Sequence, residues 1–239
     1  MSLEAVTFDL WNTLVYNRNY GEFRLPELER VLNEYGLELT PEEVNEAYIS
    51  GFRYSSRMIP AEGYRHIETH EIVDKVLKTV GYSSDTIRDE LVRIYEEAIL
   101  CDPPRLKEGV FEVLDYVRPR YKVGLISVTG VSPGRIMRDI LRDHGIFHYF
   151  DVLTFSDEVK LVKPNPKLFT SCLEELNTEP RKAIHVGDSF KSDIVGAIDA
   201  GMRTIWIKTR EQNKKKGYEP DKVIKSLREL PKVLRSLES

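Results

Sequence analysis

The unequal spacing of five short β-prone segments constrains the fold of this chain more than any other feature of its sequence. The first segment covers residues 5–8, and about a hundred residues that read only as helix separate it from the second. The others follow at closer intervals, at 122–126, 152–155, 183–186 and 204–207. Strands that alternate with helices in this way predict parallel β-α-β units. We therefore expect an α/β fold with a doubly wound, Rossmann-like parallel sheet.

Apolar stripes at helical spacing separate the later strands. Ser132 and Pro133 predict the start of one helix, with Ser132 as the N-cap and Pro133 at the first helical position, and Gly145 marks its end. Two further stripes predict two more helices. They comprise Leu168, Phe169, Cys172 and Leu176, and then Ile194, Ala197 and Ile198, which Gly201 follows.

The helical stretch between the first two strands predicts an inserted all-helical unit. Thr40 and Glu43 form a capping box with Pro41 in the first turn, and four apolar stripes at helical spacing indicate four helices. We expect a catalytic core made of residues 1–15 and 101–239, and a helical cap made of residues 16–100. Because the insertion leaves from the end of the first strand, the cap should lie over the active-site edge as a lid.

Composition excludes several classes of partner. The 239-residue chain has a net charge of −4, and nucleic-acid binders usually carry a basic face instead. Its one basic run, residues 214–216, reads as a solvated loop. No apolar run reaches the roughly 20 residues that a spanning helix needs, and no signal peptide is visible. We expect a cytoplasmic protein that binds neither nucleic acid nor membrane, while the sequence leaves its oligomeric state open.

Four polar stretches fall at predicted strand ends. They are residues 9–13, 127–130, 163–166 and 187–188, the last with Asp193 nearby. Because the carboxyl ends of parallel strands meet at one edge of a sheet, we expect these stretches to lie together.

Three carboxylates at that edge would face a single lysine. Asp9, Asp188 and Asp193 are costly neighbours unless they are protonated or countered, and Lys163 balances only part of their charge. A hard divalent cation with oxygen ligands removes the conflict, and Mg²⁺ suits carboxylates together with a substrate phosphate. The sequence therefore predicts a Mg²⁺ site.

The four stretches, in this order and at these strand ends, resemble the motifs of the haloacid dehalogenase superfamily, most of whose members are phosphatases. The resemblance covers essentially the whole chain and includes a helical cap between the first and second motifs. It implies a hydrolase in which Asp9 is both the nucleophile and a metal ligand. The main-chain carbonyl of Trp11 and the Asp188 carboxylate would be further ligands, with Asp193 in or near the coordination shell.

The resemblance also implies groups that hold a small phosphorylated substrate. The Ser127 hydroxyl would donate a hydrogen bond to the transferring phosphoryl group. The backbone N–H groups of Val128 and Thr129 would donate to it as well. Lys163 would neutralise charge on Asp9 and on the phosphoryl oxygens. His185, inside a predicted strand, reads as packed rather than catalytic. Gly187 is expected to allow a close backbone approach or a tight turn.

Two positions depart from the family pattern. Most of its phosphatases carry a second aspartate two residues after the nucleophile, which protonates the leaving alcohol and then activates water. Trp11 stands there and has no useful proton to exchange. General acid–base catalysis is worth about 10²–10⁴-fold, so poor leaving groups should react slowly. Val128 replaces a frequent asparagine, which leaves Thr129 as the candidate to supply a hydroxyl.

Three functions stay open on these residues. Asp188 and Asp193 favour a Mg²⁺-dependent phosphatase. An aromatic residue at position 11 is also found in the metal-independent 2-haloacid dehalogenases, which would need a cationic carboxylate anchor. A third possibility is a slow or non-catalytic phosphate binder that stays phosphorylated on Asp9. The candidate anchors are Arg18, Arg24, Arg57 and Arg65, and the candidates to face the cleft are Tyr64, Arg65, His66, Tyr16, Arg18 and Tyr20.

Overall fold

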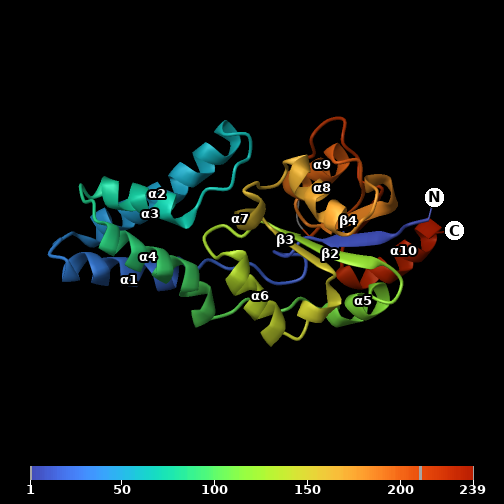
Figure 1. Cartoon of the computed structure of the whole chain (residues 1–239), viewed down its shortest axis with the longest axis horizontal. Helices are drawn as coiled ribbons and strands as arrows, with labels where there is room; N and C mark the ends of the chain where they lie inside the picture. Colours follow the sequence, from blue (N-terminus) through green and yellow to red (C-terminus); the bar gives the residue numbers. More distant parts are fainter. Residues whose placement is uncertain (1, 210–211, 239) are drawn as a thin grey trace.

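The centre of the molecule is a parallel β-sheet, seen edge-on through the middle of Figure 1. The structure is a computed structural model that describes residues 2–209 and 212–238. Within these residues six strands pair in the order β3-β2-β1-β4-β5-β6, and every pair is parallel. The expected doubly wound α/β fold is therefore confirmed. The strands are β1 (Ala5–Phe8), β2 (Lys122–Ser127), β3 (Val152–Phe155), β4 (Ala183–Gly187), β5 (Arg203–Ile207) and β6 (Lys222–Ile224).

Strand β1 occupies the switch point of this sheet. The chain runs outward from β1 through β2 to β3, and then returns to the other side of β1 to build β4, β5 and β6. Phe8, the last residue of β1, is level with Leu125 of β2 and Val186 of β4. In open α/β sheets the crevice at such a switch point, outside the carboxyl ends of the strands, is where ligands bind. Asp9 is the first residue beyond that end.

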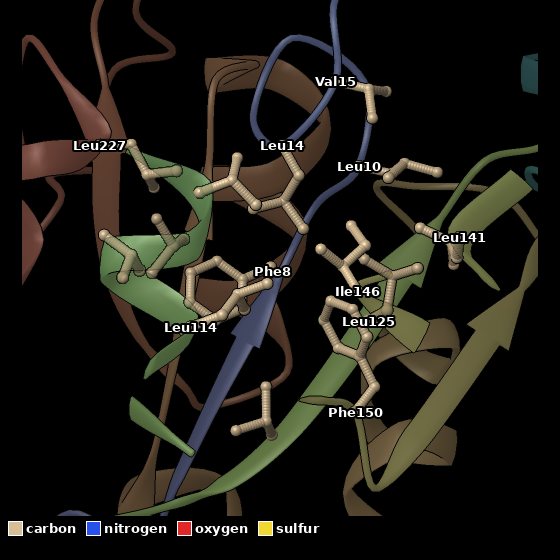
Figure 2. Close-up of a cluster of buried hydrophobic side chains, with 14 of the residues drawn as sticks. Phe8, Leu10, Leu14, Val15, Leu114, Leu125, Leu141, Ile146, Phe150 and Leu227 are labelled. Carbon is tan, nitrogen blue, oxygen red and sulfur yellow. The ribbon is translucent and has the colours of Figure 1, made fainter. Parts of the chain in front are cut away.

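Helices cover both faces of the sheet. Figure 2 shows one apolar layer, in which Phe8 of β1 lies beside Leu114 of α5 and Leu125 of β2. The opposite layer includes Cys172, which is buried as expected. The helices on the first face are α5 (Val110–Val117), α6 (Gly134–Asp143) and α10 (Leu230–Glu238), and those on the second are α8 (Pro166–Glu175) and α9 (Val195–Asp199).

Four helices between β1 and β2 form a separate layer beside the sheet, on the left of Figure 1. They are α1 (Gly21–Glu34), α2 (Pro41–Ala61), α3 (Thr69–Thr79) and α4 (Asp85–Glu97). They bury their own apolar core, to which all four contribute. The predicted capping box is present, because Thr40 Oγ1 accepts from the Glu43 N–H and the Glu43 carboxylate accepts from the Thr40 N–H. None of the helices in the described parts of the chain is both long and apolar enough to cross a membrane.

The start of α6 differs from the prediction by one residue. Pro133, not Ser132, is the N-cap, and Gly134 is the first helical residue. The carboxylate of Asp157 accepts the Gly134 N–H at 3.1 Å, so the cap comes from a distant part of the chain. Ser132 instead lies in the preceding loop. Its hydroxyl accepts a long hydrogen bond of 3.5 Å from Arg24 Nη2.

Short elements complete the fold. A four-residue helix, α7 (Ser156–Val159), follows β3, and a π-helical turn (Phe190–Ile194) leads from β4 into α9. The 3₁₀ turns are Ala98–Cys101, Phe147–Tyr149, Pro180–Lys182 and Leu227–Glu229. Strand β6 and helices α5, α7 and α10 were not predicted as separate elements.

The loop between α2 and α3 reaches back to the sheet domain. The His66 N–H donates to the Lys160 carbonyl at 3.0 Å, and the Val162 N–H donates to the Tyr64 carbonyl at 2.8 Å. Lys160 Nζ also lies 2.6 Å from Glu68 Oε1. This short antiparallel contact fixes the four-helix segment against the stretch of chain that leads into Lys163.

Candidate active site

Asp9 lies at the switch point with its carboxylate buried. Its backbone N–H donates to the Val186 carbonyl at 2.9 Å, which continues the β1–β4 pairing by one residue. Oδ1 accepts from Lys163 Nζ at 2.8 Å, while Oδ2 is buried without a hydrogen-bond partner among the described residues. Burial raises the pKa of this carboxyl to about 7; Lys163 lowers it, and the nearby carboxylates raise it. One carboxylate oxygen is thus available to a ligand.

Asp188 and Asp193 lie beside Asp9, as the sequence predicted. Ligand atoms of the three carboxylates lie within 4.8 Å of one another, and all three residues are buried. Asp193 Oδ1 accepts from Lys163 at 2.8 Å and Oδ2 accepts from the Ser189 N–H at 2.8 Å. Burial alone would raise the pKa of Asp193, but Lys163 and His185 hold it well below its usual range.

Lys163 is a buried ammonium between two carboxylates. It is 5 % exposed, and its Nζ lies 2.8 Å from both Asp9 Oδ1 and Asp193 Oδ1. Burial would lower the pKa of this ammonium, but the two carboxylates raise it above its ordinary value. Lys163 is therefore charged, and it offsets part of the negative charge of the cluster.

His185 and Gly187 shape the floor of the site, on β4. The His185 Nε2 lies 3.5 Å from Asp193 Oδ1 and its Nδ1 lies 2.9 Å from Thr7 Oγ1. Burial lowers the pKa of this imidazole to about 4, so it is neutral and packed, as predicted. A Cβ on Gly187 would lie 2.4 Å from Asp193 Cγ. The Asp193 side chain therefore packs directly on the Gly187 backbone, where no side chain fits.

In the segment that begins at the end of β2, some polar groups are hydrogen-bonded within the protein and one has no partner among the described residues. The Ser127 hydroxyl is buried and has no hydrogen-bond partner in the described residues. The Val128 carbonyl accepts from the Trp11 indole N–H at 3.0 Å. Thr129 donates its N–H to Ser156 Oγ at 3.0 Å and its hydroxyl to Asp157 Oδ1 at 2.9 Å. Ser127 is therefore available to a ligand, whereas Thr129 is already bonded within the protein.

The donor set at the switch point fits a hard divalent cation. It offers carboxylate oxygens only, and one of them, Asp9 Oδ2, is buried without a partner among the described residues. The oxygens of Asp193 are held by Lys163 and Ser189, so Asp9, with Oδ2 unpartnered among the described residues, is better placed than Asp193 to bind a metal. The Asp188 main chain is fixed by two donors, Trp206 Nε1 at 2.9 Å and Gln212 Nε2 at 2.8 Å.

A cavity of about 300 Å³ lies between the four-helix segment and the loops after β1 and β2. Trp11 and residues 128–132 line it from the sheet side, and Arg18, Tyr20 and Arg24 line it from the other. Of the residues expected to face the cleft, Tyr16 is 49 % exposed and has Lys107 over its ring. Arg65 pairs with Glu62 and Glu71, and His66 is buried against Ser156.

Arg24 was expected only as one of four candidate carboxylate anchors, and Gln212 had no expected role. Helical spacing carries a signal for Arg24, which lies one turn before Leu28 on the buried face of α1. Gln212 had no such signal, because its position depends on the loop after β5 folding back onto Asp188.

Residues 3–201 match the family model of the haloacid dehalogenase-like hydrolases. This match covers well over half of the chain, which therefore belongs to that hydrolase family, as the motifs predicted.

Known proteins extend this similarity. A glyceraldehyde 3-phosphate phosphatase of Methanopyrus kandleri is 37 % identical over 242 residues, covering 98 % of each chain. The pyrimidine 5′-nucleotidase YjjG of Escherichia coli is 34 % identical over 140 residues; that match spans 57 % of this chain and 59 % of the relative, less than two thirds of it. A 2-haloacid dehalogenase structure from Pseudomonas syringae pv. Tomato has a TM-score of 0.75 at 24 % identity, covering 98 % of this chain and 99 % of that one, which shows a shared fold.

Proposed function

We propose that this hydrolase is a Mg²⁺-dependent phosphatase of small phosphorylated metabolites that acts through a covalent intermediate on Asp9. The observation that carries the proposal is Asp9 Oδ2, a buried carboxylate oxygen without a partner among the described residues, beside two more carboxylates and one lysine. Phosphatase names among the relatives, above all the full-length match from Methanopyrus kandleri, support the same chemistry.

In the proposed reaction a carboxylate oxygen of Asp9 attacks the phosphorus atom. An O–P bond forms to Asp9 as the ester P–O bond breaks, and the leaving oxygen takes a proton from solvent. Water then attacks the phosphorus of the aspartyl phosphate, which releases inorganic phosphate and the free carboxylate. The Ser127 hydroxyl donates to a phosphoryl oxygen, and Lys163 offsets negative charge as it develops.

A bound Mg²⁺ would supply positive charge against the phosphoryl oxygens and would lower the repulsion among the carboxylates. Asp9 and Asp188 would hold it, together with the main-chain carbonyl of Trp11, and Asp193 would lie at the edge of its shell. Asp193 also keeps Lys163 in place, because Oδ1 accepts from Lys163 at 2.8 Å.

Trp11 limits the range of substrates. Its indole N–H is held by the Val128 carbonyl, and the side chain has no acid–base function near neutral pH. The leaving group must therefore depart without a protein acid. We propose that esters with good leaving groups, such as aryl phosphates, react fastest.

The proposed division of labour follows the layers of the fold. A core of residues 1–15 and 101–239 carries the reacting groups, and a cap of residues 16–100 covers them and selects the substrate. The cavity supports this division, since Trp11 and Thr129 line it from the core while Tyr20 and Arg24 line it from the cap.

Trp11 also keeps 2-haloacid dehalogenation as a second candidate. Halide leaves without a proton, so a site without a general acid is no obstacle to that reaction. Chloride release from 2-chloropropionate in the presence of a chelator would favour it over phosphoryl transfer. A protein that becomes phosphorylated but turns over slowly is the third reading, and it predicts a long-lived adduct on Asp9.

A metal-dependence profile on a panel of phosphate esters tests the proposal. The wild type should hydrolyse p-nitrophenyl phosphate with Mg²⁺ and lose that activity with a chelator. Trp11→Asp should raise the rate on alkyl phosphates, whose leaving groups need a proton, by up to about 10²–10⁴-fold. Trp11→Phe is the matched control and should give no gain. An absence of hydrolysis across the whole panel with Mg²⁺ would refute the proposal.

A further inference from the structure

Arg24 is a buried cation without an acidic partner. It is 6 % exposed and lies on the inner face of α1, in line with Leu28. Within the parts of the chain that the structure describes, no carboxylate lies within ion-pair distance of its guanidinium. Buried charges are rarely left in this state, because removal from water is costly unless an opposite charge compensates.

The groups that contact Arg24 in the described parts of the chain are neutral, and they include the Tyr48 hydroxyl. Its Nε donates to the Tyr95 carbonyl at 3.0 Å, and Nη2 makes a long contact of 3.5 Å with the Ser132 hydroxyl. The ring of Tyr20 lies 5.7 Å from the guanidinium carbon. Burial lowers the pKa of Arg24 relative to its ordinary value, with only partial compensation from the surrounding tyrosines. These contacts hold the side chain in position but leave its charge unbalanced.

The contact with Tyr95 uses the main chain of that residue. Its carbonyl accepts from Arg24, while its ring packs against Tyr48 and Phe52 in the core of the four helices. Arg24 therefore joins α1 to α4 through this carbonyl and to the loop after β2 through Ser132.

Arg24 lines the cavity that also contains Trp11 and Thr129. Trp11 is two residues beyond Asp9, and Thr129 is two residues beyond Ser127, so the cavity is lined by the same two loops that carry these residues. Arg18 lines the same cavity, but its charge is countered by Glu22 and Asp102. Of these two arginines only Arg24 lacks a carboxylate partner in the described residues, so it could pair with an anionic group of a ligand.

We propose that Arg24 binds a carboxylate of the substrate, so that among esters with comparable leaving groups the preferred substrates are small phosphorylated carboxylic acids. Guanidinium groups bind carboxylates strongly and with defined geometry. A cavity of about 300 Å³ is at the small end of ligand sites, which limits the substrate to a few carbon atoms. This inference rests on the proposed phosphatase function and adds the class of substrate to it.

The test compares two esters that differ in one group, 3-phosphoglycerate and glycerol 3-phosphate. The wild type should prefer the acid by about 10-fold or more in kcat/KM. Arg24→Gln should lower kcat/KM for the acid by about 10–100-fold, mainly through KM, and for the alcohol by less than about 3-fold. Arg30→Gln is the matched control, because Arg30 is an exposed arginine on the same helix, outside the cavity. It should change neither value.

Several results would overturn the inference. Equal losses on both esters would give Arg24 a structural role only, and a wild type without a preference for the acid would remove the carboxylate site. Preference for propane-1,3-diol bisphosphate over 3-phosphoglycerate would reassign the anion. If Arg24→Gln fails to fold, Arg24→Lys and inhibition of the wild type by glycerate against glycerol decide the question.

Hydrolysis of p-nitrophenyl phosphate separates this inference from the proposed function. That ester carries no carboxylate, so its turnover reports the phosphoryl-transfer groups alone. Normal turnover of it without any preference for acids would refute the carboxylate site and leave the phosphatase in place. Loss of all phosphate-ester hydrolysis in the wild type would instead refute the proposed function.

Discussion

Lys163 and Arg24 are both buried cations, yet their surroundings differ completely. Lys163 lies at the carboxyl edge of the sheet with two carboxylate oxygens at 2.8 Å. Arg24 lies on the four-helix segment and binds a carbonyl, a hydroxyl and the face of an aromatic ring. The two residues are almost equally buried, at 5 % and 6 % exposed.

The charge of Lys163 is balanced by carboxylates of the protein, whereas that of Arg24 has no carboxylate partner in the described residues. A buried ion pair that is fully hydrogen-bonded is hard to break, because removing one partner leaves the other uncompensated. A buried cation among neutral groups has the same desolvation cost but no attraction to a counterion to offset it. Proteins break such rules mainly at functional sites. Lys163 thus belongs to a self-contained site, and Arg24 to one that an incoming anion completes.

The largest effect on activity is expected at Asp9, one of the two carboxylates that pair with Lys163. Asp9→Asn removes the attacking oxygen, and hydrolysis of p-nitrophenyl phosphate should fall by more than about 10⁴-fold. Lys163 keeps Asp193 as its partner, so the variant should remain folded by circular dichroism. A folded Asp9→Asn protein that retains a tenth of the wild-type rate would remove Asp9 from the chemistry.

Lys163→Met should be the most destabilising of the changes compared here. It leaves two buried carboxylates without their cation, and the free energy of unfolding should fall by about 3–5 kcal/mol. Urea denaturation without divalent cations measures this. Lys160→Met is the control, because the Lys160 ammonium is exposed and forms a surface ion pair with Glu68, which is worth about 1 kcal/mol or less. Similar losses in the two variants would contradict a balanced buried site.

The pH dependence of stability should report His185, on the Lys163 side. Its pKa is lowered from 6.5 to about 4 in the folded protein, so below pH 6.5 the unfolded chain binds a proton that the folded one does not. His185 therefore contributes a loss of stability as the pH falls from about 6.5 to 4, by about 3 kcal/mol at most, whereas Asp9, whose pKa is raised to about 7, contributes a gain over the same window. His185→Asn should remove the loss, so that acidification from pH 6.5 to 4 destabilises this variant less than the wild type, whereas the same change at the exposed His148 should leave the wild-type profile as it is. An unchanged slope in His185→Asn would exclude His185 as its source.

The smallest effect on stability is expected at Arg24. Arg24→Met loses the hydrogen bonds of Arg24 with Tyr95, Ser132 and Tyr48 but also removes a buried, unbalanced charge, and the free energy of unfolding should change by no more than about 1 kcal/mol. Measured beside Lys163→Met, this gives the contrast between the two cations directly. A loss of about 3 kcal/mol or more would mean that Arg24 is a structural residue.

The sheet and the acidic cluster could be predicted because they depend on local patterns. Short β-prone runs marked five strands, and topology then required the residues after them, including Asp9 and Asp188, to meet. Strand β6 was not predicted because it has three residues, two of them exposed, and pairs at the edge of the sheet.

Other features depended on contacts between distant segments. The cap of α6 comes from Asp157, which no local signal connects to Gly134. Thr129, expected to offer a hydroxyl to the substrate, donates it to Asp157 instead. The lack of a carboxylate near Arg24 could not be predicted either, because the sequence shows that an arginine is present but not which acidic side chains lie close to it.

The central claim, a phosphoryl group carried on Asp9, is tested most directly by trapping it. The wild type is mixed with p-nitrophenyl phosphate and Mg²⁺, quenched in cold acid within the first turnover, and the peptide that contains Asp9 is analysed by mass spectrometry. We expect one phosphoryl group on that peptide, at Asp9, which is absent from Asp9→Asn and from samples with chelator. Continued turnover with no phosphoryl group on the peptide would contradict it.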